Sequence, residues 1–175
     1  MIKMFTTQLS GLMNRIFDKE EFSIEDGARL LAQAAVGEGN IYICGFGEME
    51  VVAIEALKGK EPLANARILA ADQLDELTSA DRVLLVSRFS TDEDALQLGQ
   101  QLVEKQIPFV AVSGAVSSDS AKDLTTLADV HIDTKVIKSM LPDESGERVG
   151  FPATIAALYI YFCLKFTLEE MLNEY

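Results

Sequence analysis

The sequence predicts an α/β fold in which a parallel sheet is flanked by helices. Short apolar runs rich in β-branched residues alternate along the chain with stretches of helical spacing. The clearest strand is Arg82-Val-Leu-Leu-Val-Ser, and a continuous apolar run of this kind is typical of a strand covered on both faces. The 175 residues are enough for one core and contain no obvious linker or repeat, so we expect a single domain over residues 1–175.

Composition and charge argue against several classes of function. The formal net charge of -13, without runs of Lys or Arg, argues against a nucleic-acid-binding surface and against an anionic membrane surface. The first residues do not show a basic region followed by an apolar core, so no secretory signal is predicted. Cys44 and Cys163 both lie in apolar runs, which indicates buried free thiols in a reducing compartment. We therefore expect a cytoplasmic protein.

Residues 1–38 are predicted to form two helices that precede the sheet. Apolar residues from Phe5 to Phe17 recur at helical spacing and indicate an amphipathic helix. Ser23-Ile-Glu-Asp resembles a capping box, so we expect a second helix to begin there and to end at Gly37 or Gly39.

The segment 40–59 predicts a strand, a glycine turn and a helix. The apolar run 41–44 meets Gly45 and Gly47, and helical spacing then continues to Leu57. Glycines let the backbone turn sharply and approach a ligand closely, and a helix N-terminus behind such a turn suits a phosphate. Any strand–helix unit also needs a flexible turn, so a structural turn and a ligand-binding loop are about equally favoured by this segment alone.

Three further strands are expected, at 67–70, 107–113 and 130–132, which together with 41–44 and 82–87 place the sheet core within residues 39–134. Ser90, Thr91 or Asp92 can cap the helix that follows the strand at 82–87. The stretch from 135 to 150 is predicted to be a long polar loop.

The closing segment 151–173 is apolar nearly all round and is predicted to be one helix with Pro152 near its start. The apolar run is marginally short for a membrane span and is interrupted by Lys165. A helix that is apolar on all sides is expected to be buried on all sides, either in the core or against a second subunit.

The order and spacing of these pieces resemble the sugar isomerase (SIS) domain family, and most closely its phosphoheptose isomerase group. The resemblance is carried by four segments, 39–47, 80–91, 105–114 and 127–132. It implies a three-layer, doubly wound, five-stranded parallel sheet in flavodoxin-like order. In such sheets ligands bind at the carboxyl ends of the strands where the winding direction reverses. For this chain that place lies between the loops 45–49 and 87–92.

The family holds a sugar phosphate with small hydroxyl residues in these two loops, and this chain departs from that pattern. Met49 stands near the position of an expected serine, and Phe89 and Ser90 stand where Ser and Gly are expected. Arg88 can offer a bidentate contact to phosphate, whereas Glu48 adds negative charge. The candidate ligand-binding residues are Gly45, Gly47, Glu48, Met49, Ser87, Arg88, Ser90 and Thr91.

Catalysis is the less supported part of the resemblance. Aldose–ketose isomerisation needs a base, and phosphoheptose isomerases carry a Glu and a His for it, with the His near the closing helix. Here His131 is the only histidine, and it falls in the last predicted strand as a partly buried structural residue. Glu144 and Glu147 remain as catalytic candidates, although solvated loop carboxylates are the simpler interpretation. We expect weak or absent isomerase turnover, no metal and no cofactor.

Three functions follow from these patterns. The first is an SIS-like domain that binds a phosphorylated sugar or related carbohydrate derivative and assembles as a homodimer or homotetramer. The second is a non-catalytic regulatory or interaction module on the same scaffold, which associates through its terminal helices. The third is a nucleotide-binding α/β protein, for which Glu50 occupies the place of the last glycine in G-x-G-x-x-G and Asp72 is a candidate ribose-binding acid.

Overall fold

The computed structural model describes residues 1–117 and 122–174, and its centre is a five-stranded parallel sheet in the order β2-β1-β3-β4-β5. Every neighbouring pair of strands runs parallel, which confirms the predicted fold class. The strands are β1 (Ile41–Gly45), β2 (Ala66–Ile68), β3 (Arg82–Phe89), β4 (Phe109–Gly114) and β5 (Val130–Asp133).

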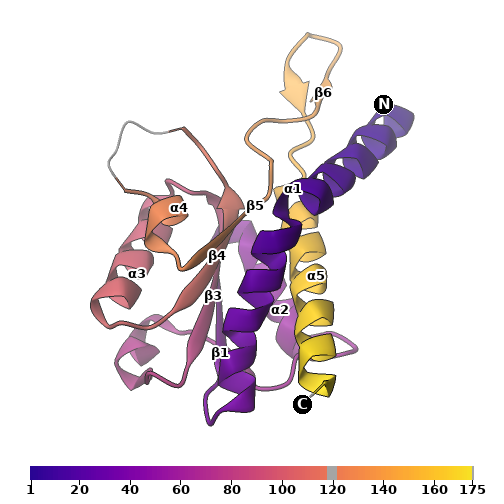
Figure 1. Cartoon of the computed structure of the whole chain (residues 1–175). Helices are drawn as coiled ribbons and strands as arrows, with labels where there is room; N and C mark the ends of the chain where they lie inside the picture. Colours follow the sequence, from indigo (N-terminus) through magenta and orange to yellow (C-terminus); the bar gives the residue numbers. More distant parts are fainter. Residues whose placement is uncertain (118–121, 175) are drawn as a thin grey trace.

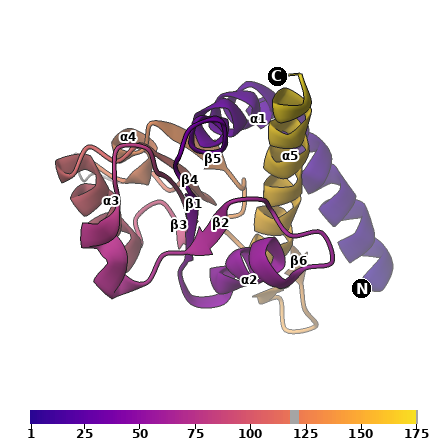
Figure 2. The same ribbon diagram turned by 90° about the horizontal axis from the view of Figure 1, so that it is seen from below.

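Helices cover both faces of the sheet, so the fold has three layers (Figures 1 and 2). One face packs against α1 (Ile2–Val36), α2 (Glu50–Lys58) and α5 (Ala153–Asn173). The other packs against α3 (Glu93–Glu104), α4 (Leu124–Leu127) and the short helix η2 (Ala71–Glu76). Alternation along β3 supplies both cores, because Leu84 and Val86 belong to the first and Val83 and Leu85 to the second.

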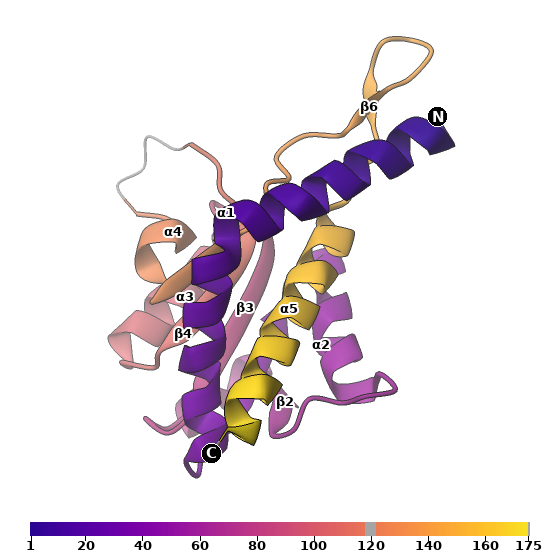
Figure 3. The same ribbon diagram turned by 45° about the vertical axis from the view of Figure 1, so that its right-hand side comes forward.

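The N-terminal region is one helix, so the prediction of two helices was wrong. Ser23 lies inside α1 rather than at a helix start. The buried stripe continues through the expected break, with Ile16, Ile24 and Leu31 all 5% exposed or less. This packing outweighs the local capping signal. The ribbon changes direction near the middle of α1, and the N-terminal half projects beyond the sheet (Figure 3).

The closing helix α5 forms as predicted and lies beside α1 over the sheet, but within this chain it is not buried on all sides. Its small and branched residues, including Ala156, Ala157 and Ile160, are buried in the core. Lys165 is 4% exposed and pairs with Glu169 at 2.8 Å. Phe166 is 53% exposed. Among the residues that the structure describes, no helix combines the length and the apolar character needed to cross a membrane.

The polar segment after β5 contains a short antiparallel hairpin that was not predicted. It pairs β6 (Leu141–Pro142) with β7 (Arg148–Val149). The Asp143 carboxylate accepts backbone N–H groups from Ser145 and Glu147, which fixes the turn between the two strands. In Figure 1 the hairpin rises beside the N-terminal half of α1.

A buried carboxylate joins the middle of α1 to the end of β5. Glu20 accepts the backbone N–H of Asp133 at 3.2 Å and pairs with the ammonium of Lys135 at 2.6 Å. Lys135 also pairs with the Asp133 carboxylate at 3.1 Å. Burial alone would lower the pKa of Lys135, but the hydrogen bonds with Glu20 and Asp133 raise it above the ordinary value. The stabilisation from this pKa shift is therefore present at neutral pH and is lost as pH rises through the raised pKa of Lys135.

Replacing Glu20→Gln is expected to lower the free energy of unfolding by about 2 kcal/mol, because it removes one partner of a largely buried ion pair. Urea denaturation at neutral pH measures this change. Glu21→Gln is the matched control, since Glu21 is exposed on the same helix and a surface substitution typically changes stability by less than about 0.5 kcal/mol. Equal stability of the two variants would contradict the anchoring role of Glu20.

Candidate functional site

The first loop of the predicted site is a tight turn between β1 and α2. Phe46 donates its backbone N–H to the carbonyl of Val86 at 3.0 Å, and the short helix η1 (Gly47–Met49) follows. Gly47 has a φ of +57°, a conformation that favours glycine. A Cβ on Gly45 would lie 2.2 Å from the carbonyl oxygen of Met49. Both glycines are thus explained by the backbone geometry of the turn.

The hydroxyl groups of the second loop are engaged within the protein. Ser87 is fully buried and donates to the carbonyl oxygen of Phe89 at 2.9 Å. Ser90 is also fully buried, donates to the Asp123 carboxylate at 2.9 Å and accepts the backbone N–H of Val116 at 3.1 Å. These contacts use the side chains that the family resemblance assigned to phosphate.

The predicted site residues therefore separate into a buried and an accessible group. Met49 is 0% exposed and packs in the core with α1 and α5. Thr91 is half-buried, and among the described residues the lining of the depression between the two loops includes neither Thr91 nor Met49. Gly47, Glu48 and Arg88 do line that depression, which has a volume of about 270 Å³.

One ion pair joins the two loops. The guanidinium of Arg88 donates to both oxygens of the Glu48 carboxylate, with Nε–Oε1 at 2.6 Å and Nη2–Oε2 at 2.8 Å. The hydrogen bond with Arg88 lowers the pKa of Glu48, and the same bond raises the pKa of Arg88. The fork geometry is the one that a guanidinium also makes with a phosphate. Glu48 therefore occupies the donors that a phosphate would use.

Further carboxylates surround this ion pair. Asp92, Glu93 and Asp94 line the same depression, and Glu93 and Asp94 form the first turn of α3. Glu50 begins α2. Carboxylates at helix N-termini interact favourably with the helix dipole, as a bound anion would. The depression thus presents one guanidinium among several negative charges. Glu50, at the start of α2, stands where a dinucleotide-binding fingerprint needs a glycine, which disfavours the nucleotide-binding alternative.

Phe89 connects the second loop to the closing helix. Its ring packs edge-on against Phe151, immediately before α5, with the ring centroids 5.8 Å apart. Edge-to-face aromatic pairs typically contribute about 0.5–1.5 kcal/mol beyond their area burial. The aromatic residue that replaces an expected serine therefore has a packing role.

The candidate catalytic residues lie elsewhere. Glu144 and Glu147 are exposed on the hairpin β6–β7, and neither is among the described residues that line the depression. His131 lies in β5, and its Nε2 is 2.8 Å from the hydroxyl oxygen of Ser113. Burial lowers the pKa of His131, so it is neutral at pH 7. A neutral histidine bonded inside the sheet matches the expectation of a structural residue.

Sequence reasoning missed Asp123. This buried residue accepts the backbone N–H of Thr125 at the start of α4 and also accepts the Ser90 hydroxyl. Burial alone would raise the pKa of Asp123, but its hydrogen bonds with Thr125 and Ser90 lower it below the ordinary value. The local signal was available, because Asp is a preferred N-cap residue and Leu124-Thr-Thr-Leu follows it.

Comparison with known proteins gives a family and a fold. The family model described as "Domain of unknown function (DUF2529)" matches residues 1–172. The uncharacterized protein YwjG of Bacillus subtilis (strain 168) is 44% identical over 175 residues, which cover 100% of this chain and 99% of that protein.

Solved structures with a similar fold include the sugar isomerase domain of the RpiR transcription factor from Sphaerobacter thermophilus, with a TM-score of 0.69, 17% identity, and 99% and 91% of the two chains covered. Phosphoheptose isomerase GmhA from Neisseria gonorrhoeae gives a TM-score of 0.69 and 13% identity, with 97% of each chain covered. The Vibrio vulnificus NanR protein complexed with ManNAc-6P gives a TM-score of 0.69 and 15% identity, with 97% of this chain and 62% of that chain covered. These likenesses confirm the SIS fold.

Proposed function

The chain belongs to the DUF2529 family and has the SIS fold, and we propose that it is a non-catalytic domain that binds a phosphorylated sugar through Arg88. The observation that carries this proposal is the fork between Arg88 and Glu48 at the carboxyl ends of β1 and β3. A phosphate that displaces the Glu48 carboxylate keeps the same two N–H donors. Neighbours of the same fold that act on phosphoheptose or hold ManNAc-6P support the ligand class.

The carboxylates around Arg88 are expected to make binding weak in the unmodified protein, chiefly through their negative charge near the phosphate of the ligand. The ligand has to displace Glu48 from Arg88 and to approach Asp92, Glu93 and Asp94. Both members of the Arg88–Glu48 pair are partly exposed, at 50% and 35% of their side chains, so the pair itself contributes at most about 1 kcal/mol to stability. Displacement of Glu48 therefore has a small energetic cost.

Glu48→Gln is expected to strengthen the binding of sugar phosphates, because the amide releases Arg88 and removes a like charge. Thermal-shift titration with sedoheptulose 7-phosphate and N-acetylmannosamine 6-phosphate measures the effect. A ligand at about 100 times its Kd should stabilise the fold by about 2.7 kcal/mol. Arg88→Gln should abolish the response, and the unphosphorylated sugars are the controls. Weaker binding by Glu48→Gln would show that the carboxylate belongs to the ligand site and would contradict the displacement.

Isomerase turnover is expected to be absent. Among residues 1–117 and 122–174, the side chains that line the depression include no histidine, and His131 is bonded inside the sheet. Incubation of the purified protein with sedoheptulose 7-phosphate, followed by product analysis, tests this expectation. Robust conversion that Glu147→Gln removes would contradict it and would restore the hairpin carboxylate as a base.

A second candidate function, an interaction module, is favoured by exposed aromatic residues on the terminal helices. Phe17 and Phe22 on α1 are 50% and 79% exposed, and Phe166 on α5 is 53% exposed. Phe17 and Phe166 line one groove between the two helices. Exposed apolar surface of this kind is typical of protein–protein contacts. We infer that the chain forms at least a homodimer through these helices.

The double change Phe17→Glu with Phe166→Glu is expected to convert the assembly to a monomer, because it places two charges in the proposed interface. Light scattering at micromolar concentration gives the mass. Val103→Glu is the control, since Val103 is 48% exposed on α3, on the opposite face of the sheet from α1 and α5, and should leave the mass unchanged. A monomeric unmodified protein would remove the inference.

A further inference from the structure

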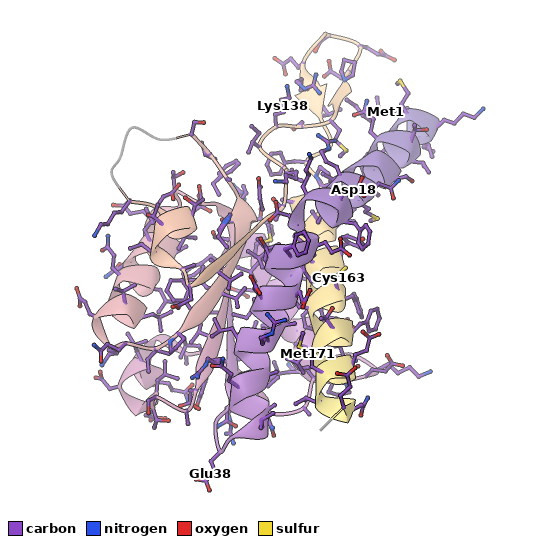
Figure 4. The ribbon with its side chains drawn as sticks, viewed as in Figure 1. Met1, Asp18, Glu38, Lys138, Cys163 and Met171 are labelled. Carbon is purple, nitrogen blue, oxygen red and sulfur yellow. The ribbon has the colours of Figure 1, made fainter. Side chains whose placement is uncertain are left out.

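Basic side chains line a second depression, which is formed by residues outside the two loops described above. It has a volume of about 540 Å³ and lies between the N-terminal half of α1 and the segment from Lys135 to Arg148. Arg15, Lys135, Lys138 and Arg148 all line it. Four of the chain's 15 Lys and Arg residues thus meet here, in a molecule that carries 28 Asp and Glu residues. Figure 4 marks Lys138 beside the hairpin, above the bend of α1 near Asp18.

Two of these cations are held in place. Lys135 is fixed by Glu20 and Asp133, and neither carboxylate lines the depression. Arg148 donates from Nε to the carbonyl oxygen of Ser139 at 2.7 Å and from Nη2 to that of Met140 at 2.8 Å. Carbonyl oxygens orient the guanidinium, and no ion pair of Arg148 is found among residues 1–117 and 122–174.

The other two cations have no ion-pair partner in the described part of the chain. Arg15 and Lys138 lie on opposite walls, one on α1 and the other in the segment before β6. Within residues 1–117 and 122–174, no carboxylate oxygen is recorded within 4.0 Å of either charged group. This arrangement is the reverse of the depression at Arg88, whose guanidinium is paired with Glu48.

The depression is large enough to hold a small molecule rather than a single ion. Gly11 lies inside α1 on the lining, and a Cβ placed there would have no atom within 4 Å. Glycine is unfavourable in a helix interior, so its open position in this wall has no packing explanation. Ile137, which is 54% exposed, and Met140 give the depression an apolar part, and Gln8 and Ser139 add polar groups.

We propose that this depression is a second ligand site, which binds a small anionic molecule through a phosphate or carboxylate group. Arg15 offers paired donors to the anionic group, and Lys138 adds a point charge. Arg148, whose Nε and Nη2 bind carbonyl oxygens, contributes its remaining N–H groups and its charge. The apolar part of the ligand packs against Ile137 and Met140. This site is independent of the proposed function at Arg88.

The test is a titration of isotope-labelled full-length protein, followed through its backbone amide signals. The probes are glucose 6-phosphate and citrate, which distinguish a phosphate from a carboxylate source, and glucose is the neutral control. Saturable shifts are expected at Gly11, at Arg15, along 135–140 and at Arg148. The double change Arg15→Gln with Lys138→Gln should weaken binding by about tenfold or more, the loss expected for charge-assisted hydrogen bonds.

Three further variants serve as controls and as an independent test of the site. Lys58→Gln with Lys60→Gln removes the same charge at exposed positions on and after α2 and should leave the titration unchanged. Gly11→Leu should weaken binding while the other amide signals keep their folded positions. Arg88→Gln should remove any shifts in residues 45–49 and 87–92 and leave the shifts at Gly11, Arg15, 135–140 and Arg148 unchanged, which separates the proposal from the function proposed above.

The proposal is overturned by shifts confined to residues 45–49 and 87–92, by an absence of saturable shifts, or by equal binding in the Arg15/Lys138 variant. Equal loss of binding in the Lys58/Lys60 variant would indicate attraction by overall charge alone and would also overturn it. If the Arg15/Lys138 variant changes the mass by light scattering and leaves the titration unaltered, the surface is an interface between copies and the ligand site is refuted.

Discussion

The close packing of α1 and α5 on one face of the sheet is the constraint on which the rest of the structure depends. Gly27 lets α1 approach closely, because a Cβ there would lie 3.2 Å from Leu164 and 3.4 Å from Ile132 and Val110. Ala28, Ala156 and Ala157 are at most 1% exposed along the same contact. With this face covered by the C-terminal half of α1, the N-terminal half extends past the sheet, where the hairpin lies beside it. The basic depression exists only because one helix spans both regions.

Most polar side chains of the two loops at the carboxyl ends of β1 and β3 are bonded within the protein. Their serines are bonded inside the protein, their cation is paired with Glu48, and the first turn of α3 carries its own carboxylates. A loop built to receive phosphate leaves such donors open until the ligand arrives. Here the protein's own side chains fill most of these roles, and in the function that we propose an incoming anion displaces Glu48 from Arg88.

Sequence patterns predicted the sheet well because its strands are buried and apolar, and burial on both faces leaves a strong local signal in 82–87 and 109–113. They failed at α1, where Ser23 gives a local start signal that a buried stripe of long-range contacts overrides. They also did not predict which side chains of the two loops are paired and which are buried. The pairing of Glu48 with Arg88 joins residues 40 positions apart, and the inward turn of Met49 depends on helices from both ends of the chain. Neither is encoded in a short pattern.

Gly45 shows that a glycine in a ligand loop can be required by the backbone alone. The carbonyl of Met49 would lie 2.2 Å from any Cβ at this position, so the turn excludes every other residue whether or not an anion is bound. This glycine is therefore compatible with a loop that binds phosphate and with one that does not. It reports the path of the backbone, whereas the chemistry of the loop depends on the side chains beside it.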